Sequence, residues 1–418
     1  MSIATSPNPH IFLSAGEASG DVYGAHLIHS LREALPEASF SGLGGQRMQE
    51  AGQQRVVRAE DVAHMGITEV IRHAPYIYSQ FQNLIRHIRE TKPSTAILID
   101  FPDVNFRLAR ELKKLGIPVI WFVSPQLWAW KRRRLKWVQQ RVTKMLCIFP
   151  FEEPFYRHRG VSAEFVGHPL AELPLPTISR EDYAQLYNLS VEKPWIALLP
   201  GSRWKEIEAN LPSMVEMACR HPRDCEYILP VASTIDRKRL ADFVAGWITH
   251  YPGSDARIPL PYIHLVDDAR EALHHARASI VASGTATVQA ALIGNPFVVI
   301  YKVSAVTFKL AKHFIWYPIE IPADVDRDGN LPIGMVNLIA GRRIVPELLQ
   351  DRFNPDTLSE VLAPLLDDTP ARAQQISDLT EVRSRLATVG STSIERVRDA
   401  VLASLSNPTL ERTTNLAS

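Results

Sequence analysis

The sequence has little cysteine and no long hydrophobic run. Its three cysteines, Cys147, Cys219 and Cys225, form no CxxC pair, which argues against a disulfide framework or a zinc site and indicates a reducing compartment. No stretch of about 18 apolar residues is present to span a bilayer. The first 20 residues lack the charged start and apolar run of a signal peptide. We therefore expect a cytoplasmic protein, which leaves binding to a membrane surface open.

An excess of charge is also missing. The formal net charge is +1 at pH 7, so the chain has no overall attraction for nucleic acid and any basic surface must be local. The phosphate-binding pattern GxxxxGK[ST] is absent, which excludes a P-loop nucleotide site. The composition itself is that of an ordinary globular protein, 46% hydrophobic and 22% charged, and the 418 residues suffice for two domains of roughly 150 residues or more each.

Short apolar runs alternate with helical patterns in both halves of the chain. Single helices between strands predict right-handed βαβ units and parallel sheets. A proline-rich stretch at residues 169–194 separates the two halves and is the predicted linker. The predicted strands include residues 10–14, 39–43, 96–99, 117–123 and 145–149 before the linker, and 195–199, 227–231, 263–266, 279–282 and 297–300 after it.

These patterns predict an α/β protein with two Rossmann-like, doubly wound parallel-sheet domains facing a cleft. We place the first domain at residues 1–172 and the second at residues 173–360. Ligands bind such sheets at the carboxyl ends of the strands. Helices are predicted over residues 361–418.

Two loops of the first half follow predicted strands. The loop at residues 14–21 is rich in small residues, and its glycines let backbone N–H groups approach an anion or a sugar, although a plain tight turn explains the pattern equally well. Asp100 and Asp103 follow the strand at 96–99. A carboxylate at this edge can accept a proton from an attacking hydroxyl, and the alternative is a helix cap. We assign the base to Asp100 and the cap to Asp103.

A segment rich in tryptophan and arginine follows the strand at 117–123. Three tryptophans and five cations fall within ten residues. Tryptophan favours membrane interfaces, and arginine pairs with phosphate. This predicts contact with a membrane or a phosphorylated lipid, and a solvated helix face or nucleic-acid binding remain alternatives. The predicted contact residues are Trp128, Trp130, Arg132, Arg133 and Arg134.

Two loops of the second half also follow strands and precede helices. An arginine beside a Gly-Ser turn can clamp a diphosphate. Small hydroxyl residues with exposed backbone N–H groups form an anion-binding nest without a metal. The two loops together predict a diphosphate site more specifically than either does alone. The residues concerned are Gly201, Ser202 and Arg203 in one loop and Ser283, Gly284 and Thr285 in the other.

Eight segments in fixed order resemble the lipid-A-disaccharide synthase family. Each is weak alone, but the ordered set is specific and spans about residues 10–365. The resemblance implies a B-type glycosyltransferase fold, a donor site mainly in the C-terminal domain, no cofactor and no metal. The segments are SAGEASGDVYGAHLI, DFPDVNFRLA, VSPQLWAWKRRR, FPFEEPFY, FVGHPLA, LLPGSR, ASGTAT and VNLIAGRRIVPELLQ.

The resemblance also implies a reaction. An inverting transferase condenses UDP-2,3-diacylglucosamine with 2,3-diacylglucosamine 1-phosphate (lipid X), releasing UDP and the β-1,6-linked disaccharide 1-phosphate of lipid A biosynthesis. It implies a location peripheral to the inner membrane and a possible homodimer. For the helices at 361–418 two arrangements stay open: they cross back to the first domain, or they exchange between the subunits of a dimer. Asp100 would deprotonate the acceptor hydroxyl, and the UDP diphosphate would contact Arg203 and the loop at 283–285. By the same resemblance Asn337 serves the donor, and the acceptor side is formed by Ser14, Gly16, Glu17 and Ser19.

The sequence departs from the family pattern at two places. Gln289 stands where the family usually has a glutamate for the donor ribose, and glutamine forms hydrogen bonds without the charge. Residues 319–332 are longer than usual and are predicted to form an inserted hairpin or loop. Two other functions stay open: a UDP-sugar epimerase or other UDP-sugar transferase, and a non-catalytic protein that binds lipids or nucleotide sugars.

Overall fold

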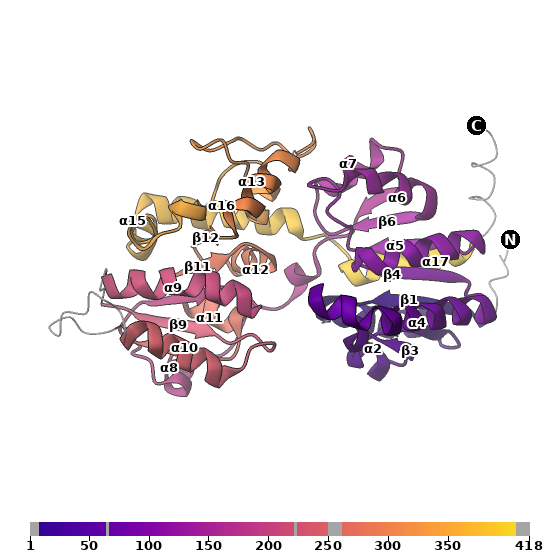
Figure 1. Cartoon of the computed structure of the whole chain (residues 1–418), viewed down its shortest axis with the longest axis horizontal. Coiled ribbons are helices and arrows are strands. Elements are labelled where there is room, and N and C mark those ends of the chain that lie inside the picture. The colour runs from indigo at the N-terminus through magenta and orange to yellow at the C-terminus, as the bar shows by residue number, and fades with distance from the viewer. Residues whose placement is uncertain (1–7, 64–66, 221–223, 250–260, 316, 407–418) are drawn as a thin grey trace. The chain divides into compact units, whose positions relative to one another are not determined.

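The computed structural model describes residues 8–63, 67–220, 224–249, 261–315 and 317–406 (Figure 1). The chain divides into two compact units. The first unit comprises Met1–Glu172 together with Leu386–Ser418, and the second comprises Leu173–Arg385. Each unit is an α/β fold around one parallel sheet, so the predicted fold class is confirmed.

The first unit is built on a seven-stranded sheet in the order β3-β2-β1-β4-β5-β6-β7. All neighbouring strands are parallel. Every residue of β4 is buried, as expected for a parallel strand covered on both faces. The strand order reverses between β1 and β4, and ligands bind such sheets at this switch point. The strands are β1 (His10–Ala15), β2 (Ser39–Gly44), β3 (Gln54–Arg58), β4 (Thr95–Ile99), β5 (Val119–Phe122), β6 (Lys144–Cys147) and β7 (Ala163–Phe165).

Helices from both ends of the chain cover this sheet. The C-terminal helix α17 (Ser393–Ser406) packs on α1 (Ala18–Ala34) and β4, and Figure 1 shows it in yellow beside β4. Its Val397 and Val401 are fully buried. The chain thus returns to the first unit after α16. The other helices are α2 (Gln46–Glu50), α3 (Glu60–Ala63), α4 (Ile67–Thr91), α5 (Pro102–Lys114), α6 (Leu135–Arg141) and α7 (Glu152–Arg157), with short 3-10 turns at Arg132–Arg134 and Pro169–Glu172.

The second unit repeats the plan with six parallel strands in the order β10-β9-β8-β11-β12-β13. Its switch point lies between β8 and β11. The strands are β8 (Trp195–Leu199), β9 (Glu226–Pro230), β10 (Ile263–Val266), β11 (Ala278–Ala282), β12 (Phe297–Tyr301) and β13 (Glu347–Leu349). The helices are α8 (Arg180–Tyr187), α9 (Trp204–Arg220), α10 (Arg237–Thr249), α11 (Ala269–His275), α12 (Thr285–Ile293), α13 (Ala305–Phe314), α14 (Met335–Ala340), α15 (Pro355–Leu366) and α16 (Pro370–Leu386), with a 3-10 turn at Gln350–Arg352.

The strands that the sequence patterns do not predict lie at sheet edges. β3, β7 and β13 are edge strands, and β7 and β13 have only three residues each. A short, partly exposed strand needs no continuous apolar run, so its pattern is weak. The segment at 319–332 contains no strand. It is a loop with a turn in which the Asp326 carboxylate accepts bonds from the backbone N–H groups of Asp328 and Asn330.

Candidate functional site

In the first unit, the loops that follow β1 and β4 pack directly against each other. A Cβ atom on Gly16 would lie 2.3 Å from the ring of Phe101, so only glycine accommodates this ring. Asp100 and Phe101 both have left-handed backbones, with φ of 45° and 46°. Two consecutive non-glycine residues in this conformation store strain, which is typical of functional sites. The packing brings Asp100 to the switch point beside Glu17.

The Asp100 carboxyl is half-buried and electrostatically perturbed. Burial, followed by the nearby charge of Glu17, raises the pKa of Asp100 to about 6. Its backbone is fixed from two sides, because its N–H donates to the Phe122 carbonyl over 2.9 Å and its carbonyl accepts from Asn105 Nδ2 over 2.7 Å. A carboxylate with a pKa near neutrality in a fixed position is suited to general-base catalysis.

Ser14 lies inside the fold. It is fully buried, and its hydroxyl donates to Asn105 Oδ1 over 2.7 Å. Its one donor is therefore used inside the fold, and its place on the acceptor side stays a prediction. Ser14 orients Asn105, which in turn holds the backbone of Asp100. The sequence analysis missed Asn105, although it lies in the same segment, DFPDVN, as Asp100.

Glu17 and Ser19 are exposed at the start of α1. The Glu17 side chain makes no capping hydrogen bond. A cavity of about 460 Å³ is lined by Gly16, Glu17 and Asp21 together with residues that follow β2 and β3. The Asp21 carboxylate accepts backbone N–H bonds from Gly45, Arg47 and Met48, which fixes the opposite wall. The Asp21 carboxylate is thus used inside the fold, and Glu17 is the carboxylate that this cavity presents to a hydroxyl group.

Tyr23 is a further site residue that the sequence analysis missed. It is half-buried on α1, and burial, then the charge of Asp100, raises the pKa of its phenol to about 12. Its ring lies 5.9 Å from that of Phe122. Tyr23 therefore stays protonated at neutral pH and is close to Asp100. Tyr23 follows Ser19 by four residues, so the two side chains lie on the same face of the helix. This spacing could have identified Tyr23 as a site residue.

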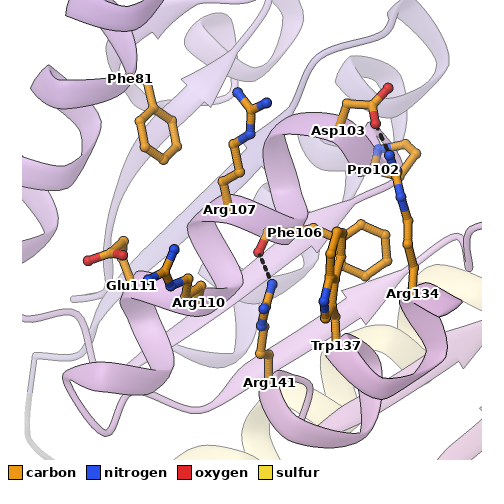
Figure 2. A pocket seen from close by; sticks show the side chains of 10 residues that line it. All are labelled: Phe81, Pro102, Asp103, Phe106, Arg107, Arg110, Glu111, Arg134, Trp137 and Arg141. Atoms are coloured by element: carbon orange, nitrogen blue, oxygen red, sulfur yellow. Dashed lines mark hydrogen bonds and ion pairs between the residues drawn. The ribbon is translucent and has the colours of Figure 1, made fainter.

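Asp103 does not cap a helix. Helix α5 begins at Pro102, and its N-cap position is Phe101, without a side-chain cap. Asp103 lies in the first turn, and its Oδ1 pairs with Arg134 Nη1 at 2.8 Å (Figure 2). The prediction of a capping role was wrong because α5 starts at Pro102, which places Asp103 inside the helix. Of the two aspartates, Asp100 alone follows β4 directly.

Trp128 is not available for a membrane. Only 2% of its surface is exposed, and its indole Nε1 donates to Glu152 Oε1 over 3.1 Å. Burial raises the pKa of Glu152 to about 7. The polar edge of Trp128 is therefore satisfied inside the fold, away from the surface where the predicted contact would form. Glu152, from the FPFEEPFY segment, is a buried anchor of the loop after β5 that the sequence analysis missed.

The rest of the basic segment is at the surface. Trp130 is 51% exposed, and Lys131 Nζ lies 4.1 Å from its ring centre. Arg133 is exposed, whereas Arg132 and Arg134 are half-buried. Arg132 Nη2 donates to the Trp128 carbonyl. These residues form a basic, aromatic surface, and their contact with a membrane or phosphate stays a prediction.

In the second unit, the loop after β8 presents one arginine. Gly201 has a φ of 132°, which a side chain rarely adopts. The backbone N–H groups of Ser202 and Arg203 both donate to Glu206 Oε2, over 2.9 and 3.2 Å, so they are already occupied. The Arg203 side chain is 81% exposed, and its Nη1 lies 3.6 Å from Glu206 Oε1. This loop can therefore offer a guanidinium to an anion, rather than a row of backbone N–H groups.

The loop after β11 complements it at the same switch point. Gly284 is the N-cap of α12 and provides no side-chain cap, so the first N–H groups of the helix point to solvent and favour an anion. Ser283 is half-buried, whereas Gly284 and Thr285 are exposed. Gln289 lies one turn further along α12 and is half-buried. Ser283 Oγ donates to the Ile333 carbonyl over 3.3 Å, which ties this loop to the start of α14.

Asn337 is a structural clamp. It is fully buried, its Oδ1 accepts from the N–H groups of Ile344 and Val345, and its Nδ2 donates to Glu347 Oε1 over 2.8 Å. Both ends of this amide are used inside the fold, and its role toward the donor stays a prediction. Glu347, which the sequence analysis missed, also accepts from the N–H group of Gly334 over 2.9 Å. Together Asn337 and Glu347 hold the backbone next to Ser283.

Two further properties concern only the residues that the structure describes. Within those ranges, no helix is long and apolar enough to cross a membrane. In the same part of the chain, no three His, Cys, Asp or Glu side chains lie together in a way that would hold a metal ion.

The sequence matches one family over nearly its whole length. The family model described as lipid-A-disaccharide synthetase covers residues 11–401. The chain is 52% identical over 395 residues to the lipid-A-disaccharide synthase of Acidobacterium capsulatum, a match that spans 94% of this chain and 95% of that protein. Both the length and the identity of this match are those of a close relative.

Solved structures share the fold at low sequence identity. UDP-GlcNAc 2-epimerase from Neisseria meningitidis, bound to UDP-GlcNAc, aligns with a TM-score of 0.59 and 10% identity over 95% of this chain and 100% of that one. The calicheamicin glycosyltransferase CalG4 aligns with a TM-score of 0.54 and 15% identity over 96% and 99%. These similarities show a shared two-domain fold of the glycosyltransferase B type.

Proposed function

Because the chain belongs to the lipid-A-disaccharide synthetase family of glycosyltransferases, we propose that it transfers 2,3-diacylglucosamine from UDP to the 6-hydroxyl of 2,3-diacylglucosamine 1-phosphate. The products are UDP and a β-1,6-linked tetraacyl disaccharide 1-phosphate. Asp100 is the proposed catalytic base. The observation that carries the proposal is its position at the switch point of the first sheet, with a raised pKa beside Glu17.

In the proposed reaction, the Asp100 carboxylate removes the proton of the acceptor hydroxyl. The oxygen attacks the anomeric carbon of the donor from the face opposite UDP, so the new carbon–oxygen bond forms as the bond to the diphosphate breaks. The electron pair of the broken bond leaves on UDP, and the anomeric centre inverts. Glu17 and Ser19 orient the acceptor sugar, and Gly16 keeps the loop close to Asp100. General-base catalysis of this type contributes roughly 10²–10⁴-fold.

The proposed donor site uses the switch point of the second sheet. The exposed Arg203 guanidinium and the uncapped start of α12 carry positive charge toward the departing diphosphate, where it stabilises the charge that develops on UDP. Ser283 and Thr285 add hydroxyl groups at this point. Gln289, one turn along α12, is the proposed partner of the donor ribose, to which its amide can both donate and accept.

Substitution of Asp100 tests the base. Asp100→Asn keeps the size of the side chain and removes its proton affinity, so we expect a decrease in kcat of roughly 10²-fold or more with the KM for the donor nearly unchanged. The measurement is disaccharide formation from both acylated substrates, read by mass spectrometry, with circular dichroism to verify the fold. Turnover near the wild-type level would show that Asp100 is not the base.

The same assay separates the proposed reaction from epimerisation. With the UDP-sugar as sole substrate, an epimerase releases or equilibrates a sugar epimer, whereas the proposed transferase needs the acceptor. We expect no epimer of UDP-N-acetylglucosamine and no requirement for an added divalent metal. A product formed without acceptor would contradict the proposal.

A membrane-surface location is part of the proposal. Aromatic side chains are exposed in the first unit at Tyr78, Trp130 and Trp137, with exposed fractions of 64%, 51% and 38%. Tryptophan and tyrosine favour the interface between lipid and water. Both proposed substrates carry acyl chains, so a protein that lies on the inner membrane reaches them without crossing it.

A further inference from the structure

The outer face of α5 forms one wall of an arginine-rich cavity, which we call the arginine cavity. Its volume is about 340 Å³. Figure 2 shows its side chains converging from α4, α5, and α6 with the turn before it. It belongs wholly to the first unit and begins two residues after Asp100. Its lining residues are Phe81, Pro102, Asp103, Phe106, Arg107, Arg110, Glu111, Arg134, Trp137 and Arg141.

The cavity has more positive charge than its own carboxylates neutralise. Asp103 is paired with Arg134 at 2.8 Å. Glu111 is already paired with Lys114 at 2.7 Å and with Arg89 at 3.6 Å, both outside the lining. Within the described part of the chain, Arg107 and Arg110 form no ion pair. Each lies exposed on α5, so their charges face the cavity and solvent without a protein partner.

A third guanidinium increases this imbalance. Arg141 Nη1 donates to the Phe106 carbonyl over 3.2 Å. Among the described residues, no carboxylate pairs with the Arg141 guanidinium. Burial, then the charge of Arg110, lowers the pKa of Arg141, because the two like charges are close. Two guanidinium groups this close repel each other, and a bound anion would neutralise their charge. Guanidinium groups bind phosphate through paired, charge-assisted hydrogen bonds.

Aromatic rings form the remaining walls. The Trp137 ring lies 5.5 Å from the guanidinium carbon of Arg134 and 4.9 Å from that of Arg141, so cation–π contacts hold both arginines beside it. Trp137 is 38% exposed, and Phe81 faces the cavity from α4. An anion site with an aromatic rim matches a ligand that carries a phosphate on an apolar body.

We propose that the arginine cavity binds the phosphate group of an anionic amphiphile, with Arg107, Arg110 and Arg141 on the phosphate and Trp137 and Phe81 beside the apolar part. The identification of the amphiphile rests on the proposed function. It is either the 1-phosphate of the acylated acceptor or the head group of a bilayer phospholipid. Either source would hold the lipid beside the loop that carries Asp100.

The test compares two double variants with equal loss of charge from comparable helices. Arg107→Ala/Arg110→Ala removes two cavity arginines, and Arg86→Ala/Lys113→Ala removes two exposed cations from α4 and α5 outside the cavity. Binding is measured by equilibrium sedimentation with detergent micelles that carry 2,3-diacylglucosamine 1-phosphate, with micelles that carry its dephosphorylated form, and with phosphatidylcholine vesicles with or without phosphatidic acid.

We expect the cavity variant to bind the phosphorylated target at least roughly tenfold more weakly. Its binding to the dephosphorylated acceptor and to plain phosphatidylcholine should be unchanged, and the control should stay within about twofold throughout. Weakening confined to the phosphorylated acceptor identifies the acceptor as the source, and weakening confined to phosphatidic acid identifies the bilayer.

Two results would overturn the proposal: unchanged binding of the cavity variant to both phosphorylated targets, or an equal loss in the control variant, which would indicate unspecific attraction. The binding arms need no turnover. Failure of the wild-type protein to form disaccharide would therefore refute the proposed function while leaving the result on the cavity intact.

Discussion

Asp100 combines a strained backbone, partial burial and a neighbouring carboxylate, and each has a separate cause. The left-handed backbone comes from the tight turn between β4 and α5. The raised pKa comes first from burial and then from Glu17. A base must be ionised to accept a proton, so this pKa determines the pH range in which the proposed reaction proceeds.

The pH profile of activity tests this reasoning. With the pKa of Asp100 at about 6, kcat/KM should rise with pH through this value and level off above it, and at pH 5 it should be roughly tenfold below the plateau. Glu17→Gln removes the repelling charge, which lowers the pKa of Asp100, so its acid limb should move to lower pH. An acid limb near pH 4 in the wild type, or an unmoved limb in the variant, would contradict the assignment.

Single residues also show what a sequence motif leaves open. Ser14, Trp128 and Asn337 belong to motif segments as clearly as Asp100 does, yet all three are buried and hydrogen-bonded inside the fold. A motif shows which residue type stands at a position. It does not show whether that side chain contacts a ligand or holds another part of the protein in place. Burial makes that distinction, and burial depends on the packing of distant segments.

At the scale of elements, two strand-to-helix loops depend on each other. Gly16 follows β1 and Phe101 follows β4, and the ring occupies the space that any side chain on Gly16 would need. The parallel pairing of β1 with β4 places both loops at the same sheet edge. Neither loop has its conformation without the other, which is why the spacing of the glycines alone resembles an ordinary turn.

Gly16→Ala tests this dependence. Its Cβ would meet the Phe101 ring at 2.3 Å, so the loop carrying Asp100 must shift, and we expect kcat to decrease by roughly tenfold to 10²-fold. Gly246→Ala on α10 is the control, since among the described residues no atom beyond its own helix backbone and chain neighbours lies within 4 Å of its added Cβ, and alanine favours the helix. Adding Phe101→Leu to Gly16→Ala should restore part of the activity. Additive losses in the double variant would show that the two loops are not coupled.

At the scale of the whole molecule, the first unit is assembled from both ends of the chain. Helix α17 packs on α1 and β4. The sheet that carries Asp100 is therefore fully covered by helices only after the second unit has been synthesised. Ser393, Val397 and Val401 are buried in this contact region. The stability of the candidate base site therefore depends on residues nearly 300 positions away in the sequence.

Truncating the buried side chains of α17 tests this assembly. Val397→Ala/Val401→Ala should destabilise the first unit by about 2–4 kcal/mol, because two buried side chains leave cavities. Val389→Ala is the control, as Val389 is 93% exposed and its loss should have little effect. Hydrogen exchange read by mass spectrometry should be faster in α1 and β4 and unchanged in β8 to β13. Equal acceleration in both units would contradict the division of the chain.

The sequence by itself determined the two parallel-sheet domains, the loops that carry chemistry and the family. Apolar runs of strand length, separated by single helices, allow few arrangements, and an ordered set of motifs specifies a family even where each motif is weak. These properties depend on residues that are close together in the sequence, or on the order of short segments along it. They can therefore be recognised before the three-dimensional structure is known.

Only the tertiary structure decided which motif residues face solvent and which support others. Tyr23, Asn105, Glu152 and Glu347 acquire their roles from residues far away in the sequence, and the arginine cavity forms where α4, α5 and α6 meet. Burial, pKa and the sharing of hydrogen bonds are properties of three-dimensional surroundings. They arise when packing fixes which groups lose water and which charges become neighbours.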